Sequence, residues 1–252
     1  MLKTGLIGLG AMGSGMAHRL AQARLLYGVW NRTGATATAL AAELGVIAYP
    51  EPAALARECD LIVTSVAADA DVLEVLAALQ EGLCHDKIVV DTSTIGVDTV
   101  LQAAECVARR GAWFIDAPVS GGKEGARAGT LVMMVGGDAA AVDRALPALT
   151  AMAKKVVRMG GSGQGQAAKA VNQVMCAGIN QAVCEALAFG QALGLDMDTV
   201  ISVLSGGAAG NWFLEHRGSS MLRGSFEPGF KCALHQKDLA ICRRMLDELR
   251  VA

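Results

Sequence analysis

The sequence predicts an α/β protein in which a doubly wound parallel sheet over residues 1–160 is followed by an all-helical domain over residues 161–252. Three observations predict this class. Short apolar runs alternate with longer Ala- and Leu-rich segments through the first part of the chain, which is the pattern of repeated βαβ units. A glycine-rich motif directly follows the first of these runs. Beyond residue 165 the strand-like runs cease and helical spacing takes over.

The expected strands are short and almost continuously apolar, as in a parallel sheet that helices cover on both faces. They lie at Leu6–Ile7, Gly28–Trp30, Asp60–Val66, Lys87–Val90 and Trp113–Ile115, and Thr130–Val135 could add another. Helices are expected between the strands, among them Gly13–Ala23, Ala35–Leu44 and Asp71–Gln80.

The glycine-rich segment GGSGQG at residues 160–165 is the best candidate for a domain boundary. After it, apolar residues spaced by three and four predict one long helix that ends near Gly194. The residues of this stripe are Ala168, Val171, Met175, Ile179, Val183 and Leu187. Further helices are expected at Thr199–Leu204, Trp212–Leu222 and Ala233–Leu249.

Composition excludes several function classes. The net charge of -2 and an aromatic content of 4% give no basis for binding nucleic acid or an anionic membrane. No apolar run is long enough for a membrane span, and no signal peptide is expected. Seven scattered cysteines contain no CxxC pair, so no metal site is expected. They are interpreted as buried, reduced thiols of a cytoplasmic protein.

Residues 8–13 read GLGAMG and stand between an expected strand and an expected helix. In Rossmann dinucleotide-binding folds the first glycine permits a tight turn and the second lets the backbone approach a pyrophosphate. The third lets helix and strand pack closely, and the helix N-terminus faces the negative charge. The alternative is a glycine turn without a ligand. We expect the whole motif to bind the cofactor: Gly8, Leu9, Gly10, Ala11, Met12 and Gly13.

The second expected strand ends in Asn31-Arg32-Thr33, without the acidic residue that usually holds the ribose 2′-hydroxyl of NAD. A guanidinium and a hydroxyl suit a 2′-phosphate, since arginine offers paired donors to phosphate oxygens. We therefore expect NADPH to be preferred and NADH to be possible. The alternative is that Arg32 stacks on adenine and leaves the preference mixed.

Two further motifs carry candidate chemistry. Ser120 with Gly121 and Gly122 follows a strand and forms a small anion cradle, or else an ordinary glycine turn. Lys169 and Asn172 are three residues apart, so they share one face of the long helix. A lysine beside a carboxamide, in a chain with a nucleotide loop, suggests a proton donor beside a hydride donor. His235 has no partner at metal-ligand spacing and is interpreted as structural or as part of a rim.

Four motifs in this order resemble the β-hydroxyacid dehydrogenase family, whose members include 3-hydroxyisobutyrate dehydrogenase, tartronate semialdehyde reductase and the succinic semialdehyde reductases. They are GLIGLGAMGSGMA at Gly5–Ala17, DAPVSGG at Asp116–Gly122, GxGQxxKxxNQ within Gly161–Gln173, and KDL at Lys237–Leu239. The segment from Glu227 to Leu239 is most similar to the tartronate semialdehyde (2-hydroxy-3-oxopropionate) reductases.

The resemblance implies a role for each matching position. Lys169 would be the catalytic acid/base, and Asn172 would hold the substrate and orient the lysine. Ser120, Gly121 and Gly122 would bind the substrate carboxylate, and Lys237 would close over cofactor and substrate. Further cofactor contacts are implied for Val66, Ala67, Thr94, Phe230 and Asp238.

These observations favour an NADPH-dependent reductase that converts a short 3-oxo acid to the β-hydroxy acid, with tartronate semialdehyde to glycerate as the leading reaction. Succinic semialdehyde, glyoxylate and 3-hydroxyisobutyrate remain alternative substrates. An imine reductase is disfavoured because such relatives lack a lysine at position 169, and phosphogluconate dehydrogenase has a far larger helical domain. The alternative from another class is a non-catalytic NADPH-binding assembly module.

The resemblance also implies a longer helical domain, so we expect the domain here to be incomplete at its C-terminal end. It further implies a homodimer or homotetramer, with a small carboxylate substrate as the other partner.

Overall fold

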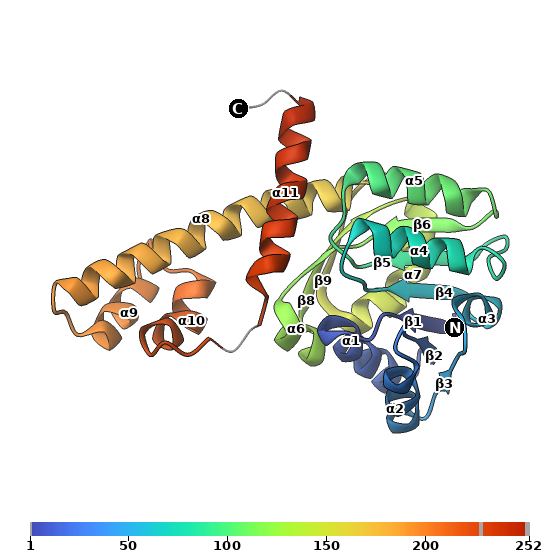
Figure 1. The fold of residues 1–252 in the computed structure, drawn as a ribbon, viewed down its shortest axis with the longest axis horizontal. Helices are drawn as coiled ribbons and strands as arrows, with labels where there is room; N and C mark the ends of the chain where they lie inside the picture. Colours follow the sequence, from blue (N-terminus) through green and yellow to red (C-terminus); the bar gives the residue numbers. More distant parts are fainter. Residues whose placement is uncertain (1, 227–228, 250–252) are drawn as a thin grey trace. The chain divides into compact units, whose positions relative to one another are not determined.

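The computed structural model of the 252-residue chain describes residues 2–226 and 229–249. Within this part, the order of elements begins with alternating strands and helices (Figure 1). They are β1 (Thr4–Ile7), α1 (Ala11–Gln22), β2 (Leu26–Trp30), α2 (Gly34–Leu44), β3 (Ile47–Ala48), α3 (Pro52–Glu58), β4 (Leu61–Thr64), α4 (Asp69–Leu79), β5 (Ile88–Asp91), α5 (Val97–Ala108) and β6 (Trp113–Asp116).

The remaining elements complete the sheet and then turn helical. They are β7 (Val119–Ser120), α6 (Gly122–Ala128), β8 (Leu131–Gly136), α7 (Ala139–Met152), β9 (Ala153–Gly160), α8 (Gln164–Ala192), α9 (Met197–Ser205), α10 (Trp212–Leu222) and α11 (Cys232–Leu249). The predicted class, a doubly wound sheet followed by helices that begin with one long helix, is confirmed. Each strand predicted from an apolar run is present, with its bounds shifted by a few residues.

The sheet has the order β3-β2-β1-β4-β5-β6-β8-β7, with β9 paired to β8. The first six strands in this order are mutually parallel. Their order reverses direction beside β1, between β1 and β4, which is where Rossmann folds bind dinucleotides. β8 runs antiparallel to β6 and β7, and it is parallel to β9.

Two apolar cores lie on the two faces of this sheet. Neighbouring residues of one strand belong to different cores, because side chains alternate along a strand. Leu6 packs with Met16 of α1 and Leu149 of α7. Ile7 packs with residues of α3, α4 and α5, including Leu76. Helices therefore cover both faces, and the carboxyl ends of the parallel strands remain available for a site.

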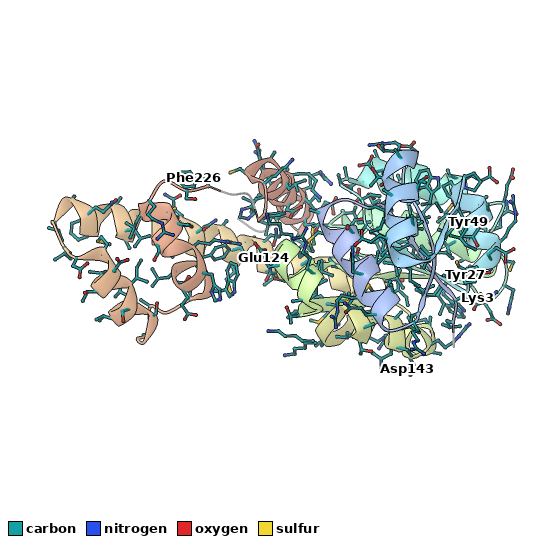
Figure 2. The ribbon with its side chains drawn as sticks, turned by 90° about the horizontal axis from the view of Figure 1, so that it is seen from below. Lys3, Tyr27, Tyr49, Glu124, Asp143 and Phe226 are labelled. Carbon is teal, nitrogen blue, oxygen red and sulfur yellow. The ribbon has the colours of Figure 1, made fainter. Side chains whose placement is uncertain are left out.

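The first strand is fixed at its beginning by interactions near Lys3. The Lys3 amino group lies 4.6 Å from the centroid of the Tyr27 ring (Figure 2), and the Lys3 backbone N–H donates to Asp60 at 2.9 Å. These contacts hold β1 between β2 and β4, so the loop that follows β1 starts from a defined position.

The chain divides into two compact units, Met1–Ala170 with Cys232–Ala252, and Val171–Lys231. The first unit contains the sheet, the beginning of α8 and α11. The second has its own small core, in which Val183 and Leu187 of α8 pack with Leu214 of α10 and with side chains of α9. The boundary predicted at residue 160 marks the change from strands to helices and stays a prediction.

The predicted stripe along the long helix is only partly buried. Val183 and Leu187 are buried, but Val171 and Met175 are 66% and 61% exposed, so one part of the stripe is covered within this chain and another part is not. Helical spacing shows which residues share a face and does not show what covers that face. The cysteines also differ from expectation, because Cys59 and Cys242 are buried while Cys84, Cys184 and Cys232 are exposed.

Three strands of the structure were not predicted, and β9 is the longest of them. The other two are β3 and β7. β9 pairs only with β8, and most of its side chains, including Lys154, Lys155 and Arg158, are exposed. An edge strand of this kind carries charges instead of an apolar run. Among the described residues, no helix has both the length and the apolar character that a membrane span requires.

Candidate functional site

The loop between β1 and α1 has the geometry that its glycines predict. Gly8 adopts a φ of +90°, and a Cβ there would lie 2.2 Å from the carbonyl oxygen of Ser65. A Cβ on Gly13 would lie 1.8 Å from the carbonyl oxygen of Gly8. Both positions therefore require glycine, one for the turn and the other for the close approach of helix to strand.

Gly10 is different, because a Cβ there would meet no atom within 4 Å. The position is open on the side where a ligand backbone would approach. Gly10 is also the N-cap of α1, which has no side-chain cap, so the amide groups of Ala11 and Met12 begin the helix beside this open space. An open glycine at an uncapped helix N-terminus fits the pyrophosphate of a dinucleotide.

The residues after β2 have distinct functions in the local structure. The Asn31 side chain accepts a hydrogen bond from the Leu9 N–H at 2.9 Å and donates to the Thr33 carbonyl at 3.2 Å. Asn31 thus ties the glycine loop to the start of α2. Thr33 is the N-cap of α2, and its hydroxyl makes no capping hydrogen bond.

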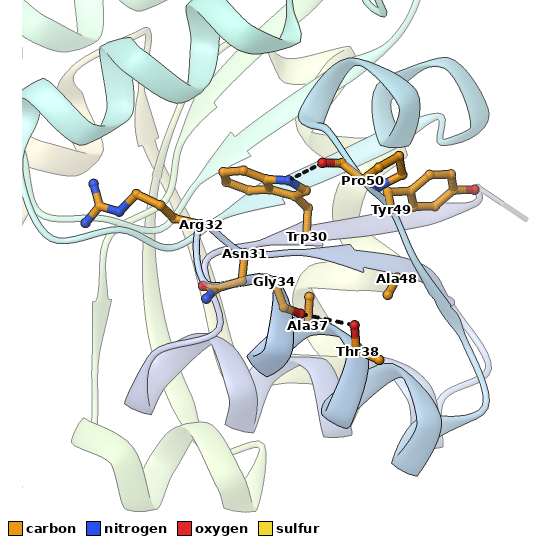
Figure 3. Close-up of a pocket in the computed structure, with 9 residues that line it drawn as sticks. All are labelled: Trp30, Asn31, Arg32, Gly34, Ala37, Thr38, Ala48, Tyr49 and Pro50. Atoms are coloured by element: carbon orange, nitrogen blue, oxygen red, sulfur yellow. Dashed lines mark hydrogen bonds between the residues drawn. The ribbon is translucent and has the colours of Figure 1, made fainter.

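Arg32 is the most exposed of these side chains. Its guanidinium lies 3.4 Å from the Asp71 carboxylate and 4.0 Å from that of Glu74, and 76% of the Arg32 side chain is exposed. A cavity of about 290 Å³ opens beside it. In Figure 3 the Arg32 side chain extends away from the opposite wall of this cavity, which Tyr49 and Pro50 form. The acidic partners of Arg32 lie on α4 and were not foreseen.

The loops after β4 and β5 are joined by a buried hydrogen-bond network. One carboxylate oxygen of Asp91 accepts from the hydroxyls of Thr64 and Ser93, at 2.6 and 2.7 Å. The Ser93 hydroxyl oxygen in turn accepts from the Val66 N–H at 3.0 Å. The predicted cofactor contacts Val66 and Thr94 therefore lie on loops that this network connects, while Ala67 is exposed on the first of them.

Burial raises the pKa of Asp91 to about 6, although the hydrogen bonds from Thr64 and Ser93 lower it and the neighbouring Asp116 raises it. The side chain is completely buried, and its second carboxylate oxygen has no partner among the described residues. Desolvation is the dominant cause, because a charged carboxylate loses the most when it leaves water.

Lys169 is buried, with only 7% of the residue exposed, and its amino group donates to the Val119 carbonyl oxygen at 2.9 Å. Val119 directly precedes Ser120, so Lys169 lies against the segment that was predicted to bind the substrate carboxylate. A buried lysine is uncommon unless it is paired or functional. This position distinguishes Lys169 from the solvated lysines of β9.

The Ser120 turn adopts a conformation that only glycine favours. Gly121 and Gly122 have φ values of +132° and +62°, and Gly121 precedes the short helix α6. Ser120 pairs with Val132 of β8, which fixes the beginning of the turn. The turn is therefore held by the sheet on one side and by α6 on the other.

Asn172 and Phe230 belong to the second compact unit. Asn172 lies one turn after Lys169 on α8, where its side-chain amide donates to Gln173 at 2.8 Å and contacts the Cys176 sulfur at 3.6 Å. Phe230 is 52% exposed. Glu227 and Pro228, which belong to the same motif as Phe230, lie outside the described residues.

Lys237 and Asp238 lie near the beginning of α11. The Lys237 amino group donates to the carbonyl oxygen of Thr94 and lies 3.0 Å from the Asp238 carboxylate. Asp238 is buried. Lys237 therefore connects α11 to the loop after β5, and it holds Thr94 by its backbone.

Two residues at the site had no assigned role in the sequence analysis. Asp116 and Gln166 are 0% and 2% exposed; Asp116 accepts hydrogen bonds from the beginning of α8, and Gln166, in the first turn of α8, contacts the loop after β5. The signal that could have revealed Asp116 is its place at the end of a strand within a motif of otherwise small residues. Gln166 stands in the motif GxGQxxKxxNQ, but no role was assigned to it because a glutamine near a helix start is common. Among the described residues, no cluster of three or more metal-ligating side chains occurs.

Two family models together match nearly the whole chain. One, described as the NAD binding domain of 6-phosphogluconate dehydrogenase, matches residues 3–161. The other, described as NAD-binding of NADP-dependent 3-hydroxyisobutyrate dehydrogenase, matches residues 163–252. The chain belongs to the 3-hydroxyisobutyrate dehydrogenase-like family of β-hydroxyacid dehydrogenases. It is an NAD(P)-dependent oxidoreductase of this family, as the resemblance implied.

Named relatives agree with this assignment. The 2-hydroxy-3-oxopropionate reductase of Escherichia coli is 39% identical over 241 residues, which cover 94% of this chain and 82% of the relative. The structure of 3-hydroxyisobutyrate dehydrogenase from Mycobacterium tuberculosis with L-serine has a TM-score of 0.88 at 31% identity, and the match covers 100% of this chain and 89% of that one.

A second solved structure, Psf3 in complex with NADP+ and 2-OPP, also has a TM-score of 0.88, at 28% identity over 96% of this chain and 86% of that one. The family assignment and the open Gly10 agree, because both point to a dinucleotide at the loop between β1 and α1. Relatives with different substrates have similar identities to this β-hydroxyacid dehydrogenase, so identity alone does not select a substrate.

Gly10→Ala should separate binding from folding. A methyl group at this position meets no protein atom, so we expect the melting temperature to stay within about 2 °C of wild type. The same methyl group occupies the space where the pyrophosphate approaches, so the Kd for NADPH should rise by roughly tenfold or more. Fluorescence titration and thermal denaturation measure the two effects. Gly206→Ala, at the end of α9, is the control and should change neither; unchanged NADPH binding by Gly10→Ala would contradict the assignment of the loop.

Asp91→Asn should change the pH dependence of stability. The folded-state pKa of Asp91 is raised above the unfolded value, so the folded protein binds the proton more tightly. Wild type therefore loses stability relative to the variant as the pH rises from about 4 to 6. A shift of about two units corresponds to at most about 3 kcal/mol at pH 7. Urea denaturation of both proteins between pH 4 and 8 measures this difference, and a difference that is constant with pH would show that Asp91 does not titrate in this range.

Proposed function

We propose that this β-hydroxyacid dehydrogenase is an NADPH-dependent reductase of short 3-oxo acids, with the conversion of tartronate semialdehyde to glycerate as its leading reaction. The similarity to the 2-hydroxy-3-oxopropionate reductase of Escherichia coli, at 39% identity, supports this substrate. The observation that carries the proposal is the buried Lys169, whose amino group lies 2.9 Å from the Val119 carbonyl beside Ser120.

Lys169 is the general acid in this proposal. NADPH, when bound, supplies the hydride that is added to the carbonyl carbon of the substrate. As the carbonyl oxygen gains negative charge, the Lys169 amino group donates a proton to it, which completes the hydroxyl group. In the reverse direction Lys169 accepts that proton. Asn172 donates a hydrogen bond from its side-chain amide to the same oxygen, since it is one helical turn from the lysine.

The glycine turn holds the other end of the substrate. Ser120 donates from its hydroxyl group, and Gly121 and Gly122 donate from their backbone amides, to the substrate carboxylate. Fixing the carboxylate and the carbonyl oxygen at two places orients a three- or four-carbon acid, and this orientation lowers the entropy cost of the reaction. Longer acids would displace one of the two ends, so the proposal limits the substrate to short chains.

The cofactor is held along the ends of the parallel strands. Gly8 to Gly13 receive the pyrophosphate, Arg32 and Thr33 receive the 2′-phosphate, and the loops at Val66–Ala67 and Thr94 contact the remainder. Lys237 closes over cofactor and substrate, with Asp238 next to it. The solved relative that contains NADP+ supports NADPH, and the ion pair of Arg32 with Asp71 weakens the preference for it.

Initial rates with a panel of substrates test the proposal. Tartronate semialdehyde, succinic semialdehyde, glyoxylate and methylmalonate semialdehyde are each measured with NADPH and with NADH. We expect the highest kcat/KM for tartronate semialdehyde with NADPH. Preference for another member would replace the substrate within the same reaction. No turnover of any member by a protein that binds NADPH would favour a non-catalytic binding module.

Lys169→Ala should remove the proton donor and leave the cofactor loop intact. Loss of a general acid costs about 10²- to 10⁴-fold, so we expect kcat to fall by that factor while the Kd for NADPH stays within about threefold. Lys154→Ala, which removes an exposed lysine of β9, is the matched control and should retain full activity. Equal turnover by wild type and Lys169→Ala would refute the mechanism.

Arg32 and Asp71 should act as a pair on cofactor preference. Arg32→Ala removes charge-assisted hydrogen bonds to the 2′-phosphate, so the Kd for NADPH should rise about tenfold or more with little change for NADH. Asp71→Asn frees the guanidinium of an exposed ion pair, worth at most about 1 kcal/mol, so NADPH should bind up to about fivefold more tightly.

The double variant decides whether Asp71 acts through Arg32. If it does, Asp71→Asn should have no effect on NADPH binding in the Arg32→Ala background. An equal gain in both backgrounds would mean that Asp71 repels the phosphate directly, independently of the arginine.

A further inference from the structure

We propose that Asp116 is the positioning residue for Lys169, because its buried carboxylate fixes the start of α8 and thereby sets the lysine amino group against the Val119–Ser120 segment. The inference rests on the catalytic role proposed for Lys169. Asp116 makes its own contacts away from the reacting atoms. It acts on Lys169 through the backbone N–H groups that it binds.

Both carboxylate oxygens of Asp116 accept hydrogen bonds from the beginning of α8. One accepts from the Gly163 N–H at 2.8 Å, and the other accepts from the Gln166 N–H at 2.9 Å. The first N–H groups of a helix lack partners within the helix, so such groups need an acceptor when they are buried. Asp116 supplies this acceptor from another strand, and the negative charge also opposes the positive end of the helix dipole.

Gly136 and Gly165 lie so close to the Asp116 carboxylate that a side chain at either position would collide with it. A Cβ at Gly136 would lie 2.4 Å from one carboxylate oxygen of Asp116, and a Cβ at Gly165 would lie 2.7 Å from the other. Gly163 has a φ of +87°, which bends the chain into the helix. The carboxylate is therefore enclosed by backbone on several sides, and α8 has little freedom to shift relative to it.

The contacts form a closed path through the site. Asp116 ends β6, and Val119 follows it by three residues on the segment that leads to Ser120. Lys169 follows Gln166 by three residues on α8, so the two lie on the same face of the helix. Lys169 then returns to Val119 through its hydrogen bond of 2.9 Å. Asp116 therefore fixes both the start of the helix that carries Lys169 and the segment that leads to Ser120. In this way it sets the distance between the lysine and that segment.

Gln166 extends this path to the loop that carries Thr94. Its side-chain amide donates to the Ser93 carbonyl at 2.7 Å, and its side-chain oxygen accepts from the Ile95 N–H at 3.3 Å. The residues on either side of Thr94 are therefore held by the same helical turn that Asp116 holds. A displacement of this turn would move Lys169 and Thr94 together.

Burial raises the pKa of Asp116 above its ordinary value, while backbone hydrogen bonds from Gly163, Gln166 and Gly165 lower it. These donors offset part of the desolvation that a buried carboxylate suffers. The inference rests on the geometry of the donors and not on the titration of Asp116.

Asp116→Asn tests the inference. The amide has nearly the same volume but directs an NH₂ group at a backbone N–H, so one side of the contact is lost. We expect kcat to fall about 100-fold, since a displacement of about 1 Å at a reacting group has that effect. The Kd for NADPH should stay within about threefold. The primary isotope effect on kcat, with NADPH deuterated at the transferred position, should increase because the chemical step becomes slower.

Asp138→Ala is the matched control. Asp138 accepts from the Ala140 and Ala141 N–H groups at the start of α7, so it caps a helix in the same way at a place remote from Lys169. Its loss should lower the melting temperature by a few degrees and leave both kcat and the isotope effect unchanged. If Asp116→Asn lowers kcat only in proportion to its folded fraction, with an unchanged isotope effect, the residue is structural and the inference fails.

A second variant covers the case in which Asp116→Asn does not fold. Gly165→Ala keeps the carboxylate but places a methyl group 2.7 Å from it and 2.4 Å from the Met134 carbonyl, which displaces the helix start. It should show the same fall in kcat and the same rise in isotope effect. Wild-type values for both would overturn the inference.

Hydrogen exchange separates this inference from the proposed function, because it needs no substrate. In either variant the amides of Gly163 and Gln166 should exchange at least tenfold faster than in wild type, whatever the enzyme reduces. Unchanged exchange at both amides would overturn the inference. Absence of wild-type turnover in the substrate panel would instead refute the proposed function.

Discussion

The start of α8 depends on a buried carboxylate that belongs to a strand of the sheet. Asp116 joins the end of β6 to the first turn of the helix, and the helix then carries Lys169 back to the segment that follows the strand. A helix normally has some freedom to rotate or slide on a sheet, because apolar contacts are not directional. Two charge-assisted hydrogen bonds remove that freedom at one end, and the site is built where they act.

This arrangement has an electrostatic cost. Asp91 and Asp116 occupy paired positions on β5 and β6, and both are completely buried. Two like charges so close cannot both be stabilised unless each has its own donors. Asp116 has backbone N–H groups that cannot turn away, whereas Asp91 has two hydroxyl groups and an oxygen without a partner among the described residues. Asp91, whose pKa is raised to about 6, therefore gains a proton more readily than an ordinary aspartate as the pH falls.

The sequence predicted the parts of the fold whose signal is local. The apolar runs located the five central parallel strands β2, β1, β4, β5 and β6, because these strands are largely buried and need no alternation. Helical spacing located α8, α9, α10 and α11. The apolar runs did not locate β9, because its residues are largely exposed. Helical spacing could not show that Val171 and Met175 are exposed. Burial depends on which surface lies opposite, and no local pattern contains that information.

The candidate site divides in the same way. The glycine loop was predictable because the adjacent backbone leaves no room for a side chain at Gly8 or Gly13, while Gly10 is open toward a ligand. The contacts of Asp116, Gln166 and Asp71 were not predictable, because their partners are 50, 71 and 39 residues away in the sequence. A side chain that acts on a distant backbone group has the same appearance in a sequence as one that faces water.

The two ends of the cofactor site consequently differ in how freely they can change. Arg32 and Glu74 are largely exposed and Asp71 is partly exposed, so the ion pairs contribute little to folding and their replacement should affect mainly binding. Lys169, Gln166 and Asp116 are buried, with Gln166 bonded to Asp116 and Lys169 bonded to Val119, so a change in any one of them leaves an unsatisfied group in the interior. The cofactor preference that we propose for Arg32 can therefore vary within this fold at little cost in stability, whereas the proton transfer that we propose for Lys169 is coupled to the stability of the sheet.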